Sequence, residues 1–220
     1  MTNIQLSKEV PSFSDKGQLS QVIAWSLVTT VCLIAFISWG GFYQWQLWPL
    51  SAYQLFPLLG LFAFSIMWSH YMMGTLGALW STKKEVLSNY FRLTGYAVLV
   101  LICLHPGLLI YQRFQDGYGL PPASYESYVA PGLGWVALLG TVSLLIFLSF
   151  ELHRFFGKRS WWHYVVDASD LAMLAIVYHG LQLGTQLQQG GFRVVWLFYL
   201  VTLLAALIYK YKKRFSQQLI

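Results

Sequence analysis

Five histidines are the side chains of this chain best suited to chemistry, because all of them lie in or beside strongly apolar segments. They are His70, His105, His153, His163 and His179. An ionisable group in apolar surroundings is costly and usually serves a function, although a neutral imidazole costs less than a charge. Imidazoles on facing helices of a bundle are also common axial ligands of a haem b iron. The histidines therefore indicate either haem ligation or polar contacts within a helix bundle.

His105 and His179 are the pair best placed to share one ligand. Basic and tryptophan residues, here Arg92 and Trp162, mark the inner ends of their two apolar segments. At 1.5 Å per helical residue, His105 lies about 20 Å beyond Arg92, and His179 lies about 25 Å beyond Trp162. We predict that this pair ligates the iron, with a hydrogen-bonded structural role as the alternative. Gly107 and Gly180 lie beside the two histidines and could let a flat macrocycle approach the backbone.

The other three histidines have less defined expected roles. The stretch from His70 to Lys83 is about 20 Å long as a helix, which predicts a depth similar to that of His105. His70 could ligate a second haem, bind a propionate of the first or simply pack. His153 and His163 adjoin charged and tryptophan residues and are predicted at the inner membrane interface, where they could contact headgroups, a propionate or an inner haem.

Three acidic residues lie at the predicted inner ends of two apolar segments: Glu151, Asp167 and Asp170. His163, Asp167 and Asp170 have the i, i+4, i+7 spacing that places them on one helix face. An aspartate near a helix start suits the helix dipole, but Asp170 lies about two turns in. It is expected to form an ion pair or relay protons to an inner site. The expected ion-pair partners are Arg154, Lys158 and Arg159.

The elements that position these side chains must be membrane helices. The 220 residues are 57% hydrophobic and only 10% charged, which excludes an ordinary soluble domain and a disordered chain. A bilayer core needs about 20 apolar residues in a helix. Six such runs predict an all-α integral membrane protein with a four-helix core formed by the second to fifth spans. The spans are about 22–43, 54–80, 93–112, 132–153, 165–187 and 193–209.

The distribution of basic residues predicts the orientation of this six-helix domain, 22–209. With both termini in the cytoplasm, the tails 1–21 and 210–220 and the inner loops hold 12 of the 14 Lys and Arg residues. Only Arg113 and Arg193 then lie outside. This asymmetry explains the net charge of +6 without a nucleic-acid partner. The expected partner of the basic loops is the lipid bilayer.

Several segments together resemble the ferric reductase-like transmembrane domain family. They are Arg92-x-x-Gly95, Leu104-His105-Pro106, Phe156-Gly157-Lys158-Arg159, Trp161-Trp162 and the span that carries His179. The segments Phe62–Ser65 and Trp68–Tyr71 resemble a bacterial stand-alone branch of this family. The resemblance covers about residues 55–185. It implies a six-helix b-type cytochrome of the bacterial cytoplasmic membrane, with ligands from the third and fifth spans.

The resemblance also bears on the number of haems. Two-haem members of the family carry a second histidine about four helical turns from the first in each ligand span. Phe91 and Val166 stand at corresponding positions here, and His163 lies nearly one turn further from His179. The resemblance therefore implies one haem b near the outer leaflet, with two as the alternative. The inner half is left for a flavin or quinone, near Glu151, Asp167 and Asp170.

These observations predict a membrane oxidoreductase subunit that carries electrons across the bilayer. The expected donor is a cytoplasmic flavoprotein, a bound flavin or a membrane quinol, and the expected acceptor is an outer one such as ferric iron. The alternative from another class is a non-redox transporter or assembly subunit with structural histidines.

Overall fold

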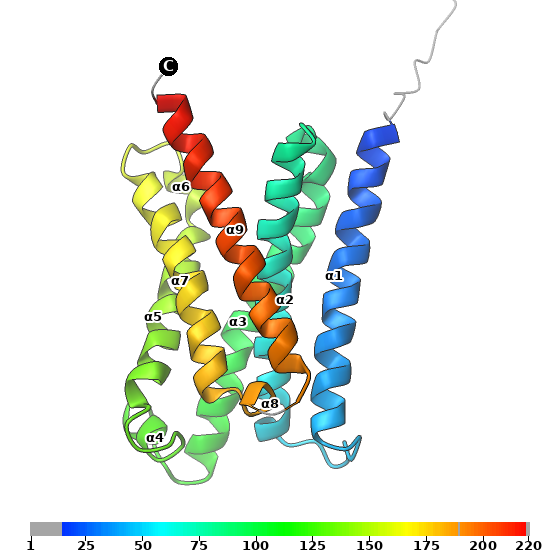
Figure 1. The fold of residues 1–220 in the computed structure, drawn as a ribbon. Helices are drawn as coiled ribbons and strands as arrows, with labels where there is room; N and C mark the ends of the chain where they lie inside the picture. Colours follow the sequence, from blue (N-terminus) through cyan, green and yellow to red (C-terminus); the bar gives the residue numbers. More distant parts are fainter. Residues whose placement is uncertain (1–14, 189, 219–220) are drawn as a thin grey trace, which may run out of the picture.

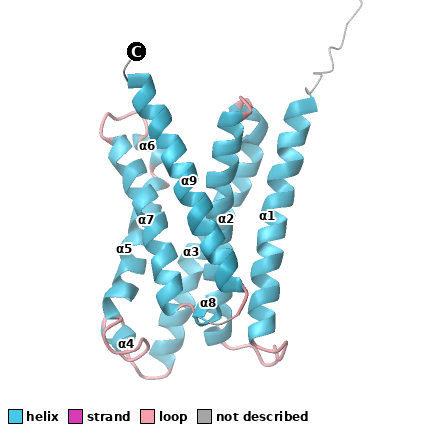
Figure 2. Ribbon diagram, viewed as in Figure 1, coloured by secondary structure: helices cyan, strands magenta, loops and turns pink. Residues whose placement is uncertain are grey.

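The computed structural model describes residues 15–188 and 190–218, and no strand occurs in these ranges. The long helices are α1 (Asp15–Phe42), α2 (Ala52–Leu79), α3 (Ser88–Gln115), α5 (Gly134–Phe150), α7 (Trp162–Leu183) and α9 (Phe192–Gln218). Short helices in the connections are η1 (Lys84–Leu87), α4 (Ala123–Glu126), α6 (His153–Phe156) and α8 (Thr185–Gln188). Loops elsewhere are short (Figure 2).

Successive long helices run in opposite directions, so the start of α1 and the end of α9 lie at the same end of the bundle (Figure 1). We call this the basic end, because η1, α6 and the lysine-rich end of α9 all lie there. The opposite end carries α4 and α8. All sites described below are located relative to these two ends.

The described chain has five helices that are long and apolar enough to cross a membrane: α1, α2, α3 together with η1, α7 and α9. The all-helical membrane fold predicted from the sequence is therefore supported at this level. The predicted span 132–153 corresponds to α5, whose 17 residues are about 26 Å long at 1.5 Å per residue. This helix is shorter than the other five, so the sixth crossing depends on it.

The helix ends differ from the predicted span ends at both termini. Helix α1 already begins at Asp15, and α9 continues to Gln218, so parts of both predicted tails are helical. Residues 1–14 and 219–220 of those tails lie outside the described residues. A helix extends past the hydrocarbon wherever its backbone hydrogen bonds continue to form. Hydropathy marks the apolar span and therefore does not predict where the helix itself ends.

The outer surface of the bundle is apolar, as expected for contact with lipid. On α9, Val194, Val201 and Ile208 recur every seven residues and are 69%, 65% and 56% exposed. Seven residues are close to two helical turns, so these side chains form one outward stripe. Such a stripe would be a liability in water and is ordinary in a bilayer.

The helices form two close pairs that α9 joins. Helix α2 packs most extensively on α3, and α5 packs on α7, whereas α9 contacts both α2 and α7. Aromatic rings fill the α2–α9 contact: the Phe64 and Trp196 centroids lie 4.3 Å apart, and those of Trp68 and Tyr199 lie 4.4 Å apart. Trp196 Nε1 also donates to the Val177 carbonyl of α7 at 3.1 Å. This tryptophan therefore ties both pairs together.

Replacing Trp196 should loosen the two helix pairs. The side chain is 1% exposed, so Trp196→Ala should lower the free energy of unfolding by about 3–5 kcal/mol through cavity formation. The neighbouring Leu197 is 43% exposed, so Leu197→Ala should lower the free energy of unfolding far less. Unfolding in detergent micelles, followed by circular dichroism, measures both variants. Equal effects of the two would contradict this account of the core.

Candidate functional site

His105 of α3 and His179 of α7 face the same cavity. The cavity has a volume of about 600 Å³ and takes its walls chiefly from α2, α3, α5 and α7. Both α3, which begins at Ser88, and α7, which begins at Trp162, start at the basic end, and each histidine lies in the second half of its helix. Both imidazoles are thus nearer the opposite end than the basic end. The volume falls within the range of about 300–1,000 Å³ typical of cofactor pockets.

Each imidazole is fixed by a backbone carbonyl of the partner helix in its own pair. His105 Nδ1 lies 2.6 Å from the Phe56 carbonyl oxygen of α2, and His179 Nδ1 lies 2.9 Å from the Val136 carbonyl oxygen of α5. A carbonyl oxygen can only accept, so each Nδ1 is the donor and carries the proton. Nε2 of each neutral ring then keeps its lone pair, the state that ligates a metal.

A glycine one helical turn beyond each carbonyl makes room for the ring. A Cβ placed on Gly60 would come within 2.8 Å of the His105 ring, and a Cβ on Gly140 would come within 2.6 Å of the His179 ring. Gly60 is four residues after Phe56, and Gly140 is four residues after Val136. The two halves of the cavity therefore use the same arrangement of carbonyl, glycine and imidazole.

These two glycines were not predicted from the sequence. Gly107 and Gly180 were expected beside the ligand, but a Cβ on Gly107 would meet nothing within 4 Å. Gly180 borders the cavity but faces Trp196 and Leu187, so it serves the packing of α9. A glycine facing a ligand residue becomes recognisable only when the helix pairs are known, and a single sequence does not reveal them.

The donor set fits a haem better than a bare metal ion. Within the described residues, no three His, Cys, Asp or Glu side chains converge to hold an ion. Two imidazoles alone leave a Zn²⁺ ion short of its usual four ligands. A porphyrin brings four nitrogens of its own and needs only two axial ligands from the protein. The paired Nε2 atoms and the largely apolar cavity meet that requirement.

A series of aromatic rings leads from His105 toward the opposite end. The Phe56 ring centroid lies 5.4 Å from that of His105 and 5.9 Å from that of Tyr128. Tyr128 in turn stacks on Tyr53 at 5.9 Å. The Tyr53 hydroxyl donates to Asp116 Oδ2 at 2.5 Å, and this hydrogen bond is the largest effect that lowers the pKa of the exposed Asp116 carboxyl. The site thus connects to the surface at the opposite end.

His70 does not share the cavity of the other two histidines, which corrects the expectation of similar depth. It lies in the last third of α2, which ends at Leu79, and its Nε2 is 2.6 Å from the Thr94 hydroxyl oxygen of α3. Its ring also contacts Tyr90 and Phe91. Lys83 was a poor marker of depth because it lies four residues beyond Leu79, the end of α2. His70 instead borders a second cavity near the basic end.

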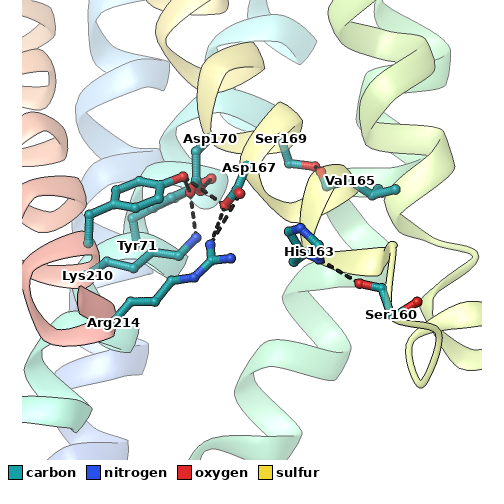
Figure 3. A network of polar contacts seen from close by, with 10 residues as sticks. Tyr71, Ser160, His163, Val165, Asp167, Ser169, Asp170, Lys210 and Arg214 are labelled. Carbon is teal, nitrogen blue, oxygen red and sulfur yellow. Dashed lines mark hydrogen bonds and ion pairs between the residues drawn. The ribbon is translucent and has the colours of Figure 1, made fainter. Parts of the chain in front are cut away.

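His153 and His163 lie at the basic end, as their neighbours in the sequence suggested. His153 is exposed and its ring lies 5.4 Å from that of Trp162. His163 Nδ1 lies 2.6 Å from the Ser160 carbonyl oxygen, and Figure 3 shows it directed away from the aspartates of its own helix. Neither histidine borders the first cavity.

The two aspartates of α7 pair with α9. For Asp170 this corrects the expected partners Arg154, Lys158 and Arg159, of which the Arg154 side chain lies outside the described residues. Lys210 Nζ lies 2.5 Å from Asp170 Oδ2, and Arg214 Nη1 lies 2.9 Å from Asp167 Oδ1 (Figure 3). The Tyr71 hydroxyl of α2 also donates to Asp170 Oδ1 at 2.8 Å. These contacts join α2, α7 and α9 near the basic end. Lys210 is far from Asp170 in the sequence, so local spacing could not indicate the pair.

The second cavity, of about 840 Å³, lies beside this polar cluster. It combines apolar walls with charged groups from several helices. Its charged and titratable lining residues are His70, Tyr71, Arg92, Tyr96, Glu151, Asp170, Tyr209, Lys210, Lys213 and Arg214. The predicted inner-site residues Glu151 and Asp170 are therefore brought to one cavity, whereas Asp167 lies beside it in the ion pair with Arg214.

Comparison with known proteins adds no relative: no family model, curated protein or solved structure matches the chain. The geometry of the two cavities and the sequence itself are therefore the observations that bear on function.

The two ion pairs should differ strongly in their effect on stability. Asp170 is 5% exposed, so Lys210→Met would leave a buried, poorly paired carboxylate and cost on the order of 3 kcal/mol of unfolding free energy. Asp167 is 32% exposed, so the matched variant Arg214→Met should cost about 1 kcal/mol or less. Unfolding in detergent micelles measures both. A larger loss in Arg214→Met would contradict this ranking.

Proposed function

We propose that this protein is a b-type cytochrome of the membrane, with one haem held between His105 and His179. The observation that carries the proposal is the matched pair of imidazoles, each with Nδ1 hydrogen-bonded to a backbone carbonyl and Nε2 free to ligate, on one cavity. The resemblance to the ferric reductase-like transmembrane domain family supports the same proposal. A bound haem supplies one-electron chemistry.

The proposed topology has six spans with the basic end in the cytoplasm of a bacterial cell. The common end of α1 and α9 and the excess of Lys and Arg there support it (Figure 1). Helix α5 would complete the sixth crossing, with the adjoining loops reaching the interfaces. The His105–His179 cavity then lies toward the outer leaflet.

The two cavities suggest the direction of electron transfer. In this proposal the basic-end cavity would receive a donor from the cytoplasm or the inner leaflet, such as a reduced flavin or a quinol. In the proposed role, Lys210 would keep Asp170 as a carboxylate that accepts a hydrogen bond from the donor, and Glu151 on the same cavity would accept a proton released on donor oxidation. The ring series Phe56, Tyr128 and Tyr53 leads from His105 toward an outer acceptor such as ferric iron.

Removing either axial imidazole should abolish haem incorporation. His105→Ala and His179→Ala each remove one Nε2 ligand, whereas His153→Ala, at the basic end, removes none. The purified variants are compared by pyridine haemochrome content per chain. One haem per chain in either of the first two variants would contradict the ligand assignment. Loss of haem only in His153→Ala would mean that the haem is bound at the basic end instead.

The glycine that faces His105 should matter almost as much as the ligand. In Gly60→Ala, the new Cβ would displace an imidazole that is now 2.8 Å away, and haem affinity should fall about 10- to 100-fold. Gly107→Ala is the matched control, because a Cβ there meets nothing within 4 Å. Haem titration of the two apoproteins measures the difference. Equal affinities would argue against the fixed ring position.

A further inference from the structure

The His105–His179 cavity has two chemically different ends. Toward the basic end its wall is apolar, formed by side chains such as Phe64, Met67 and Phe147. At the opposite end, hydroxyl and amide groups border it, including Tyr43, Tyr128 and Gln186. A ligand with one polar edge would be bound there in one orientation.

Gln186, in the short helix α8, is the most unusual of these polar groups. It is only 3% exposed, and its Nε2 has no hydrogen-bond partner of ordinary geometry in the described part of the chain. Its Oε1 is engaged, because it accepts from the Thr185 hydroxyl at 3.3 Å. Buried amide donors are rarely left unpaired, and each such group calls for an explanation.

The Tyr43 phenol is a polar neighbour of this amide. Burial raises the pKa of the Tyr43 phenol, and the Gln186 side chain partly offsets that increase. Both side chains line the polar end of the cavity, and Gln186 Nε2 has no hydrogen-bond partner of ordinary geometry there among the described residues. An acceptor that entered between them would satisfy the free donor.

One cation, Arg113, lies behind Tyr128 at the polar end without lining the cavity itself. No Lys, Arg, Asp or Glu borders this cavity among the described residues. The Arg113 guanidinium lies 3.4 Å from the Tyr118 ring centroid and 5.6 Å from that of Tyr128, and it donates to Ser127. Burial raises the pKa of both Tyr125 and Tyr128, the latter to about 12, so these phenols stay protonated near neutral pH.

We propose that Gln186 Nε2 donates a hydrogen bond to a propionate carboxylate of the haem, an inference that rests on the proposed haem site. The polar edge of the macrocycle then faces the opposite end, and its apolar edge faces Phe64 and Met67. A hydrogen bond from an amide to a charged carboxylate is stronger than one between neutral groups. Gln186 thereby sets the orientation of the haem and the acidity of that carboxylate.

The test measures the haem midpoint potential of the purified holoprotein as a function of pH. Protonating a propionate removes negative charge near the iron and raises the potential, so the potential rises as pH falls through the propionate pKa. Gln186→Leu removes the donor that stabilises the anion, so this rise should begin about one to two pH units higher. Gln115→Leu, an exposed glutamine at the end of α3, is the matched control.

Gln186→Glu is the second variant, of nearly unchanged shape, should the leucine variant lose its haem. Two facing carboxyl groups share one proton, so the same rise should again begin at higher pH. A profile that matches the wild type in both variants would overturn the assignment of Gln186. That result leaves the His105–His179 site intact, whereas a wild-type protein without haem would overturn the proposed function itself.

Discussion

The hydrogen bonds between the histidine Nδ1 atoms and two backbone carbonyls are the interactions on which the site depends. They fix the tautomer, turn the ring and leave Nε2 as the free lone pair on the cavity side. A helical carbonyl already accepts a hydrogen bond from the backbone N–H four residues later, yet its second lone pair can accept another from a side chain. The acceptor is therefore as rigid as the helix that carries it.

Each of these hydrogen bonds lies within one of two closely packed helix pairs. His105 of α3 bonds to α2, and His179 of α7 bonds to α5, so each pair carries one half of the proposed ligand site. The spacing between the halves is set by other contacts. Helix α9 provides them, through the aromatic cluster around Trp196 and through the ion pair of Lys210 with Asp170 (Figures 1 and 3).

Hydropathy predicted where the long helices lie, and the markers Arg92 and Trp162 predicted that His105 and His179 lie in corresponding parts of their helices, because both inferences depend on distances along single helices. The position of His70 was wrong because the end of α2 at Leu79 carries no charge to mark it. The partners of Asp170 were wrong because they lie on a distant helix. Gly60 was missed for the same reason, since its function exists only opposite His105.

The most direct test of the central claim is the haem content of the purified wild-type protein. A dithionite-reduced minus air-oxidised spectrum gives the haem type, and the pyridine haemochrome gives haem per chain. The account predicts a low-spin b-type spectrum with one haem per chain, held by the two imidazoles. Absence of haem after expression with an adequate haem supply would contradict it, and two haems per chain would contradict the single site.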